Sequence, residues 1–232
     1  MEGTFTERLA AVRERIAKAA LQAGRSVDSV TLIGVSKTVP AARVKEAVAA
    51  GLLELGENRV QEAREKIPAV GPGPRWHLVG HLQGNKAGQA ARLFGAVHSI
   101  DSVDLLGRLD RAAAAAGRRM TGFVQVLLAD EAQKSGVPLE GLDAVLEAAE
   151  RCEAVEVRGL MLLPPLEEDP ERSRPWFRRL RELAAEARAR HPRLRLEELS
   201  MGMSEDFEVA IEEGATHVRV GRALFGERRE DA

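Results

Sequence analysis

Two patterns of apolar residues alternate along this chain. Short runs rich in Val, Ile and Leu are typical of buried strands, whereas an apolar residue every three or four positions is typical of amphipathic helices. The strand pattern occurs at residues 30–36, 52–55, 76–79, 95–99, 121–128, 155–161, 196–200 and 216–220. The helical pattern occurs at residues 41–50, 59–67, 85–93, 102–116, 139–151, 171–190, 205–213 and 222–225.

Repeated strand–helix units of this kind predict an α/β fold, a single (β/α)8 barrel of the TIM type. Such barrels have about 250 residues, and the chain has 232. A doubly wound open sheet is the alternative, but it usually carries a G-x-G-x-x-G turn after its first strand, and this sequence has none there. Since no long Pro-, Gly- or Ser-rich linker divides the chain, we expect one domain over residues 1–232.

An extra N-terminal helix, Thr6 to Ala23, is predicted before the first strand. One face of it is apolar and could pack on the barrel or on a second copy; it comprises Leu9, Val12, Ile16, Ala20 and Leu21. The other predicted helices carry charges around most of their outer faces. Segment 171–190, for example, interleaves Arg and Glu, which favours a solvated helix over a nucleic-acid-binding one. We therefore expect a monomer, or at most a weak dimer.

Composition narrows the class of protein further. The net charge of −2 gives no electrostatic argument for binding nucleic acid or an anionic membrane. No apolar stretch approaches the roughly 20 residues of a membrane span, and the N-terminus lacks a signal-peptide pattern. The single cysteine, Cys152, excludes an internal disulfide framework and is expected to be an inert thiol. Together these features predict a cytoplasmic protein.

Lys37 lies at the end of the first predicted strand, where its preceding neighbours are mostly apolar. A lysine at the C-terminal tip of a buried strand points into the site that the strand tips build. When its amine is desolvated it can lose its proton and attack a carbonyl to form a Schiff base. A strand-end cation that reaches solvent is the other interpretation. The remaining lysines are placed on polar faces of helices (Lys18, Lys45, Lys66) or in loops and helix starts (Lys86, Lys134).

Two later strands also end at small residues where a helix begins. Residues 199–204 lead into the helix at 205–213, and Gly221-Arg222 follow the last strand. Backbone N–H groups at such turns can hold a phosphate. Ser204 could instead serve only as a helix N-cap. Two acidic residues follow it and would have to face away from a bound phosphate: Glu205 and Asp206.

Several motifs, in this order, resemble the YggS/PROSC family of pyridoxal 5′-phosphate (PLP) binding proteins. The motifs are Val35-Ser36-Lys37-Thr38, Gly56 to Glu62, Trp76 to Lys86, Gly159-Leu160-Met161, Leu199 to Ser204 and Val218 to Gly221. The resemblance covers about Leu32 to Gly226 and implies a barrel similar to the N-terminal domain of alanine racemase. Two residues depart from the expected pattern: Leu127 stands where Asn usually follows Val-Gln-Val, and Leu162 replaces a smaller or hydroxylated residue after Gly-Leu-Met.

The resemblance also implies roles for residues at the strand ends. Lys37 would carry PLP as a Schiff base, and Asn58 would approach the ring from the side. Arg219 would face the pyridine nitrogen, whereas a salt bridge from this arginine to a neighbouring carboxylate is the alternative. The phosphate would be held by Ser204, the backbone around Met203 and the amides of Gly221 and Arg222, with Ser200 in support.

A protein of this kind would act in PLP homeostasis or carriage without turnover, with apo forms of PLP-dependent enzymes as partners. A fold-type III amino-acid racemase is the alternative, but alanine racemases supply a second acid/base group, a tyrosine, and this sequence has no tyrosine. A class I Schiff-base aldolase is a third hypothesis. Its lysine lies on a later strand than the first, and no general acid/base carboxylate is evident beside Lys37.

His77 and His81 are spaced as two metal ligands on one helix would be. They flank a predicted strand end instead, and no third ligand is evident in the sequence. We therefore expect no metal site.

Overall fold

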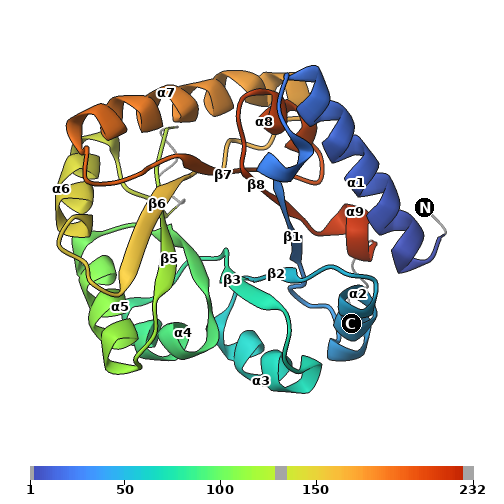
Figure 1. The fold of residues 1–232 in the computed structure, drawn as a ribbon, viewed down its shortest axis with the longest axis horizontal. Helices are drawn as coiled ribbons and strands as arrows, with labels where there is room; N and C mark the ends of the chain where they lie inside the picture. Colours follow the sequence, from blue (N-terminus) through green and yellow to red (C-terminus); the bar gives the residue numbers. More distant parts are fainter. Residues whose placement is uncertain (1–2, 129–134, 227–232) are drawn as a thin grey trace.

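The structure is a closed barrel of parallel strands with helices around it (Figure 1). The computed structural model describes residues 3–128 and 135–226. Neighbouring strands pair in chain order, and the barrel closes where β1 pairs with β8. The strands are β1 (Thr31–Val35), β2 (Glu54–Glu57), β3 (Arg75–Leu78), β4 (Ala96–Ile100), β5 (Met120–Gln125), β6 (Val155–Met161), β7 (Glu198–Met203) and β8 (His217–Val220). The predicted (β/α)8 barrel is confirmed, and the open sheet is excluded.

The helices of the described chain cover the outside of the barrel. They are α1 (Phe5–Gln22), α2 (Ala41–Ala49), α3 (Val60–Val70), α4 (Ala87–Leu93), α5 (Val103–Ala115), α6 (Leu139–Ala149), α7 (Arg174–Arg190), α8 (Phe207–Glu212) and α9 (Arg222–Phe225), with short 3-10 helices η1 (Val27–Ser29), η2 (Gly84–Lys86) and η3 (Pro170–Ser173). Across residues 3–128 and 135–226, no helix combines the length and apolar character needed to cross a membrane. Lys134 lies outside the described residues.

Many element boundaries differ from the sequence prediction by one to three residues, and two of these differences involve a glycine or a proline. Strand β7 continues to Met203, beyond the predicted end at residue 200, and includes Gly202 with a φ of 91°. A Cβ on Gly202 would lie 2.6 Å from the Cβ of Ala210, so glycine alone allows this close approach to α8. Helix α3 continues to Val70 and contains Pro68. Pro68 has no N–H to donate to the carbonyl four residues earlier, yet the helix continues for two residues beyond it.

Helix α1 packs on the barrel beside α8 and α9 (Figure 1). The ring of Phe5 lies 5.3 Å from that of Phe225, and Arg8 Nε donates a hydrogen bond to the Leu224 carbonyl at 2.7 Å. The apolar face of α1 is therefore occupied within this chain. Leu21 was assigned to that face, but its side chain is 67% exposed. The assignment was wrong because Leu21 lies in the last turn, next to the Ala20 that is buried in its place.

Candidate functional site

The ends of β1, β2 and β8 place Lys37 between two neighbouring loops. Just before Lys37, Val35 of β1 pairs with Gly56 of β2, and Gly34 of β1 pairs with Val220 of β8. Because Lys37 follows the end of β1, it lies between Asn58, which follows β2, and Gly221, which follows β8. Lys37 and Asn58 are both half-buried. The structure therefore brings together three of the predicted site residues on one face of the barrel.

The backbone just after Lys37 is strained. Thr38 has a φ of 64°, the left-handed region, which costs a β-branched residue of the order of 1–3 kcal/mol. Two hydrogen bonds hold it there: Thr38 N donates to Glu62 Oε1 at 2.6 Å, and Val39 N donates to the Ser36 carbonyl at 3.0 Å. The tight turn fixes the direction in which the Lys37 side chain leaves β1.

A buried charged cluster lies beneath this turn, and we call it the Glu57 cluster (Ser36, Glu57, Glu62 and Lys66). Lys66 Nζ donates to Glu57 Oε1 and the Ser36 carbonyl, both at 2.6 Å, and to Glu62 Oε1 at 2.7 Å. Ser36 Oγ donates to Glu57 Oε1 at 2.6 Å. Burial raises the pKa of Glu57, and the hydrogen bond from Lys66 opposes that rise. The cluster anchors the chain on both sides of Lys37.

Lys66 is therefore not a lysine on a polar helix face, as its sequence context suggested. Its side chain is only 7% exposed. Helix α3 directs this side chain inward, where the carboxylates of Glu57 and Glu62 pair with its charge and the Ser36 carbonyl accepts a further hydrogen bond. The sequence did contain a signal: Glu62 and Lys66 share the i,i+4 spacing of a helical ion pair.

Three hydrogen-bond donors lie between the ends of β7 and β8: the N–H groups of Gly221 and Ala223 and the hydroxyl of Ser204. We call them the Ser204 donors. The N–H groups of Gly221 and Ala223 point to Ser204 Oγ at 3.3 and 3.5 Å, longer than ordinary hydrogen bonds. Gly221 lies against β1, since a Cβ there would be 3.3 Å from the Val35 carbonyl oxygen. Arg222 is exposed and pairs with Glu205 at 3.0 Å.

The two acidic residues after Ser204 both have partners. Glu205 is held by Arg222, and Asp206 Oδ1 accepts a hydrogen bond from the Met203 N–H at 2.7 Å. Burial raises the pKa of Asp206, and the Met203 N–H opposes that rise. The Met203 N–H is thus directed to Asp206. The loop holds these acidic side chains on partners of their own, as a phosphate site among the Ser204 donors requires.

Arg219, on β8, is buried beside the neighbouring strands β6 and β7. It is 4% exposed, and its Nη1 and Nη2 donate to Ser200 Oγ at 2.7 Å and to the Leu162 carbonyl at 2.9 Å. Burial lowers its pKa to about 10, so it stays a cation at neutral pH. Ser200 is fully buried, and its hydroxyl faces Arg219 and His98. Ser200 was expected to support the phosphate site, but its hydroxyl bonds to Arg219 and His98 instead.

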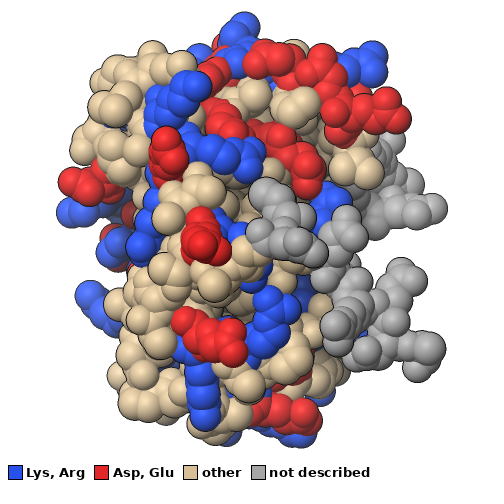
Figure 2. Space-filling model, turned by 90° about the vertical axis from the view of Figure 1, so that its right-hand side faces the viewer, with Lys and Arg blue, Asp and Glu red and all other residues tan. Residues whose placement is uncertain are grey.

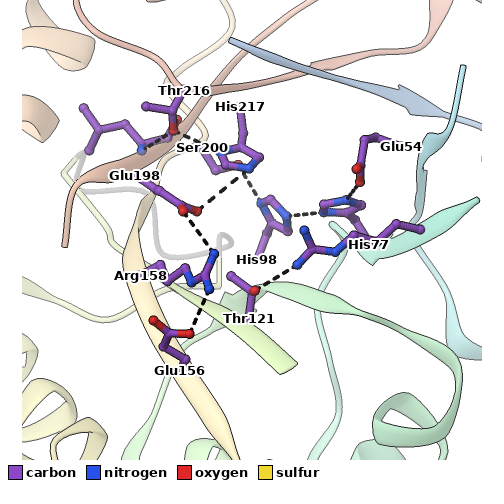
Figure 3. Close-up of polar contacts among 12 residues, drawn as sticks. Glu54, His77, His98, Thr121, Glu156, Arg158, Glu198, Ser200, Thr216 and His217 are labelled. Carbon is purple, nitrogen blue, oxygen red and sulfur yellow. Dashed lines mark hydrogen bonds and ion pairs between the residues drawn. The ribbon is translucent and has the colours of Figure 1, made fainter. Parts of the chain in front are cut away.

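A cluster of three histidines fills the middle of the barrel, where branched apolar residues are usual. His77, His98 and His217 lie together (Figure 3), with ring centroids 5.1 to 6.4 Å apart. His98 also stacks on Phe123, with centroids 4.2 Å apart. Desolvation by burial lowers the pKa of all three histidines, that of His217 to about 3. This histidine cluster was not predicted from the sequence. A polar residue recurring at inward positions of different strands was the available signal.

The histidines do not form a metal centre in the described part of the chain. His77 points into the barrel and bonds to Glu54 and His98, whereas His81 lies outside and pairs with Asp101 at 3.2 Å. Within residues 3–128 and 135–226, no group of three or more His, Cys, Asp or Glu residues is arranged to hold a metal ion.

Comparison with known proteins connects this geometry to one family. The sequence profile described as "Alanine racemase, N-terminal domain" matches residues 8–229. Pyridoxal phosphate homeostasis proteins of Aquifex aeolicus and Pseudomonas aeruginosa are each 43% identical, over 96% and 97% of this chain and 98% and 96% of theirs. The chain belongs to the pyridoxal phosphate homeostasis protein family.

Solved structures agree with this family assignment. PipY of Synechococcus elongatus PCC7942, determined with PLP bound, is similar to this chain with a TM-score of 0.87 and 42% identity, over 96% of this chain and 100% of PipY. An alanine racemase of Clostridium difficile has a TM-score of 0.73 at 13% identity, over 97% of this chain and 58% of its own. The second likeness shows the fold alone.

Leu127 and Leu162, which depart from the expected family pattern, differ in their surroundings. Leu162 is buried, and its carbonyl accepts the hydrogen bond from Arg219. The contact is made by backbone, which any residue at this position would provide. Leu127 is half-buried after β5, and its N–H donates to the Val137 carbonyl at 2.9 Å.

Proposed function

We propose that this member of the pyridoxal phosphate homeostasis protein family binds PLP through Lys37 and carries it without turning over a substrate. The observation that supports this most directly is the arrangement on one barrel face: a half-buried lysine, the Ser204 donors and the buried Arg219. The PLP-bound relative PipY adds to it.

When bound, PLP would supply an aldehyde that condenses with an amine and a ring that accepts electrons. Lys37 would hold the cofactor through its Nζ, since a neutral amine can form a Schiff base with an aldehyde, with loss of one water. The turn at Thr38 and the Glu57 cluster hold the backbone of Lys37 while this bond is made. We expect Asn58, which is half-buried on the neighbouring loop, to approach the ring from its side.

The Ser204 donors fit a phosphate by their chemistry. Two N–H groups share one hydroxyl at long distance, so both have capacity for a stronger acceptor. Ser204 Oγ adds a third donor, and the Arg222 amide lies between the two N–H groups in sequence. The Met203 N–H is not among these donors, because it donates to Asp206 Oδ1.

Arg219 suits the pyridine nitrogen because a guanidinium remains charged and can only donate hydrogen bonds. A donor there keeps a proton off the nitrogen, which weakens the ring as an electron acceptor and so suppresses turnover. The alternative salt-bridge role has less support, since the hydrogen bonds of its Nη atoms go to neutral oxygens of Ser200 and Leu162.

The composition of the chain favours carriage over racemisation. A racemase needs a second acid/base group on the opposite face of the ring, and the tyrosine that alanine racemases use has no counterpart in a sequence without tyrosine.

Two assays run side by side test this proposal. PLP-loaded protein is mixed with an apo PLP-dependent enzyme, and recovery of that enzyme's activity is followed; alanine and serine racemisation are measured on the same sample. The proposal predicts transfer without turnover. Racemisation at about 1 s⁻¹ or faster, the ordinary range for enzymes, would replace carriage with the racemase alternative.

We also infer a monomer in the cytoplasm. Packing of α1 on α8 and α9 occupies the apolar surface that a dimer would have used. Figure 2 shows Lys and Arg interspersed with Asp and Glu over the side of the molecule where α1, α2 and α9 lie. The lone Cys152, whose pKa is raised to about 11 mainly by burial, supports a reducing compartment. Light scattering across a dilution series should give a constant mass near 25.2 kDa.

A further inference from the structure

A continuous row of polar side chains crosses the barrel from Arg219 to the opposite end. Ser200 Oγ, which accepts from Arg219, lies 2.7 Å from His98 Nδ1. His98 Nε2 lies 2.9 Å from His77 Nδ1, and His77 Nε2 lies 2.6 Å from Glu54 Oε2 (Figure 3). Each link is within the distance of a good hydrogen bond. We call this row the polar chain.

The chemistry of its two ends determines where every proton lies. An ionised carboxylate only accepts, so the proton between Glu54 and His77 belongs to His77 Nε2. A neutral His77 then accepts at Nδ1, so His98 must donate from Nε2. By the same argument His98 accepts at Nδ1 from the Ser200 hydroxyl. At the other end a guanidinium only donates, so Ser200 Oγ accepts from Arg219.

We propose that the polar chain has this single direction, from Arg219 through Ser200, His98 and His77 to Glu54, and that Ser200 and His98 are positioning residues for Arg219. The polar chain connects the buried cation to a carboxylate at the opposite end of the barrel through neutral groups. Arg219 is then fixed in one orientation before any cofactor arrives. Only the last step, an effect on bound PLP, rests on the proposed function.

The surroundings of the chain are consistent with neutral histidines. Burial leaves His77 1% and His98 0% exposed, and it lowers the pKa of both, so neutral rings predominate at pH 7. The charged and titratable groups that face the polar chain from the surrounding elements are Arg75, Arg158, Glu198, Asp206 and His217. Among them, Arg75 and His217 act against a charge on His98.

The direct test is ¹⁵N NMR of the histidine rings in the apo protein, which needs neither PLP nor an activity. His77 and His98 should both carry their proton on Nε2 and should not titrate between pH 6 and pH 8. A proton on Nδ1 of His98, or an imidazolium at either ring in this range, would overturn the proposed direction.

Variants separate positioning from packing. Ser200→Ala should leave the proton of His98 on Nε2, which His77 and Glu54 fix, but it should shift the ¹⁵N signal of His98 Nδ1, because that nitrogen loses its hydrogen-bond donor; Ser200→Thr should restore the signal. His217→Asn is the matched control, since His217 belongs to the same cluster but bonds to Thr216, and it should leave the His98 signal unchanged. An unchanged His98 signal in Ser200→Ala would show that Ser200 is not its donor.

A second readout uses PLP-loaded protein. Ser200→Ala should shift the pH at which the visible absorption of bound PLP changes, and His217→Asn should not. If the NMR pattern is found but PLP does not bind, the proposed function fails and the polar chain stands. If PLP binds and both variants absorb as the wild type does, the effect on the cofactor is refuted.

Discussion

Two buried polar clusters occupy this barrel, and they deal with the cost of burying polar groups in opposite ways. The Glu57 cluster brings a carboxylate and an ammonium together at 2.6 Å beneath Lys37. The histidine cluster instead keeps its rings neutral and leaves the charges at the ends of the polar chain, on Arg219 and the half-buried Glu54. A buried charge is tolerated where it is paired and hydrogen-bonded, and a buried histidine is tolerated where it can stay uncharged.

Because of this difference, the two clusters lose stability under different changes. Removing one partner from the Glu57 cluster leaves an uncompensated charge, whereas the histidine cluster loses stability when protons are added. The first cluster supports the backbone around Lys37, and the second supports Arg219. Mutation of the Glu57 cluster therefore tests the part of the candidate site around Lys37, and acid pH tests the part around Arg219.

The largest expected effect is that of Lys66→Met. It leaves the fully buried Glu57 without its cation, which costs about 3–5 kcal/mol of the free energy of unfolding. Urea denaturation measures it. The double variant Lys66→Met/Glu57→Gln should recover much of the loss, because no charge is then stranded. Lys45→Met, at an exposed position of α2, is the matched control and should change stability by less than about 0.5 kcal/mol.

Acid should weaken the histidine cluster. The pKa of His217 is about 3 in the folded protein and about 6.5 in the unfolded chain. Between these values the unfolded state binds the extra proton, so stability is unaffected above about pH 6.5 and falls as the pH drops below it. At pH 5 this histidine alone should account for a loss of about 2 kcal/mol.

Denaturation of wild type and His217→Asn at pH 7.5 and pH 5 checks this contribution. The variant should lose less stability between the two pH values than the wild type does. His81→Asn, at an exposed histidine outside the barrel, should follow the wild type. An equal pH dependence in all three proteins would contradict the assignment of a depressed pKa to His217.

The Ser204 donors lie outside both clusters, so changing them should alter binding more than folding. Ser204→Ala removes one hydrogen bond to a charged phosphate, worth about 1.5–3 kcal/mol, or roughly a ten- to hundredfold rise in the Kd for PLP. The protein should remain coloured at high PLP concentration, because Lys37 is intact. Ser102→Ala, at the N-cap of α5, is the control that should bind PLP as the wild type does.

The strand–helix order could be predicted from sequence because it depends on local periodicity. Each predicted strand overlaps an observed one, and errors fall at ends such as Gly202, where a tertiary contact with α8 decides the backbone. The position of Lys37 at a strand end could also be predicted, since a lysine after a run of apolar residues stands out. The family assignment of the chain is confirmed by relatives at 43% identity.

The two polar clusters could not be predicted in the same way. Lys66 has the sequence context of a surface lysine, and its burial depends on Glu57, which comes from a different element. His77, His98 and Ser200 come from three different strands, so only closure of the barrel brings them into contact. The hydrogen bond from Arg219 to Ser200 was not predicted for the same reason.

Borohydride reduction of the PLP-loaded protein, followed by peptide mass spectrometry, tests the central claim most directly. Reduction should fix the cofactor to the peptide that contains Lys37, and Lys37→Ala should be colourless and carry no reduced adduct. Lys66→Met, provided that it is folded at the temperature used, should still label at Lys37. A Lys37→Ala protein that is still labelled, or a wild-type adduct on a different lysine, would contradict the account.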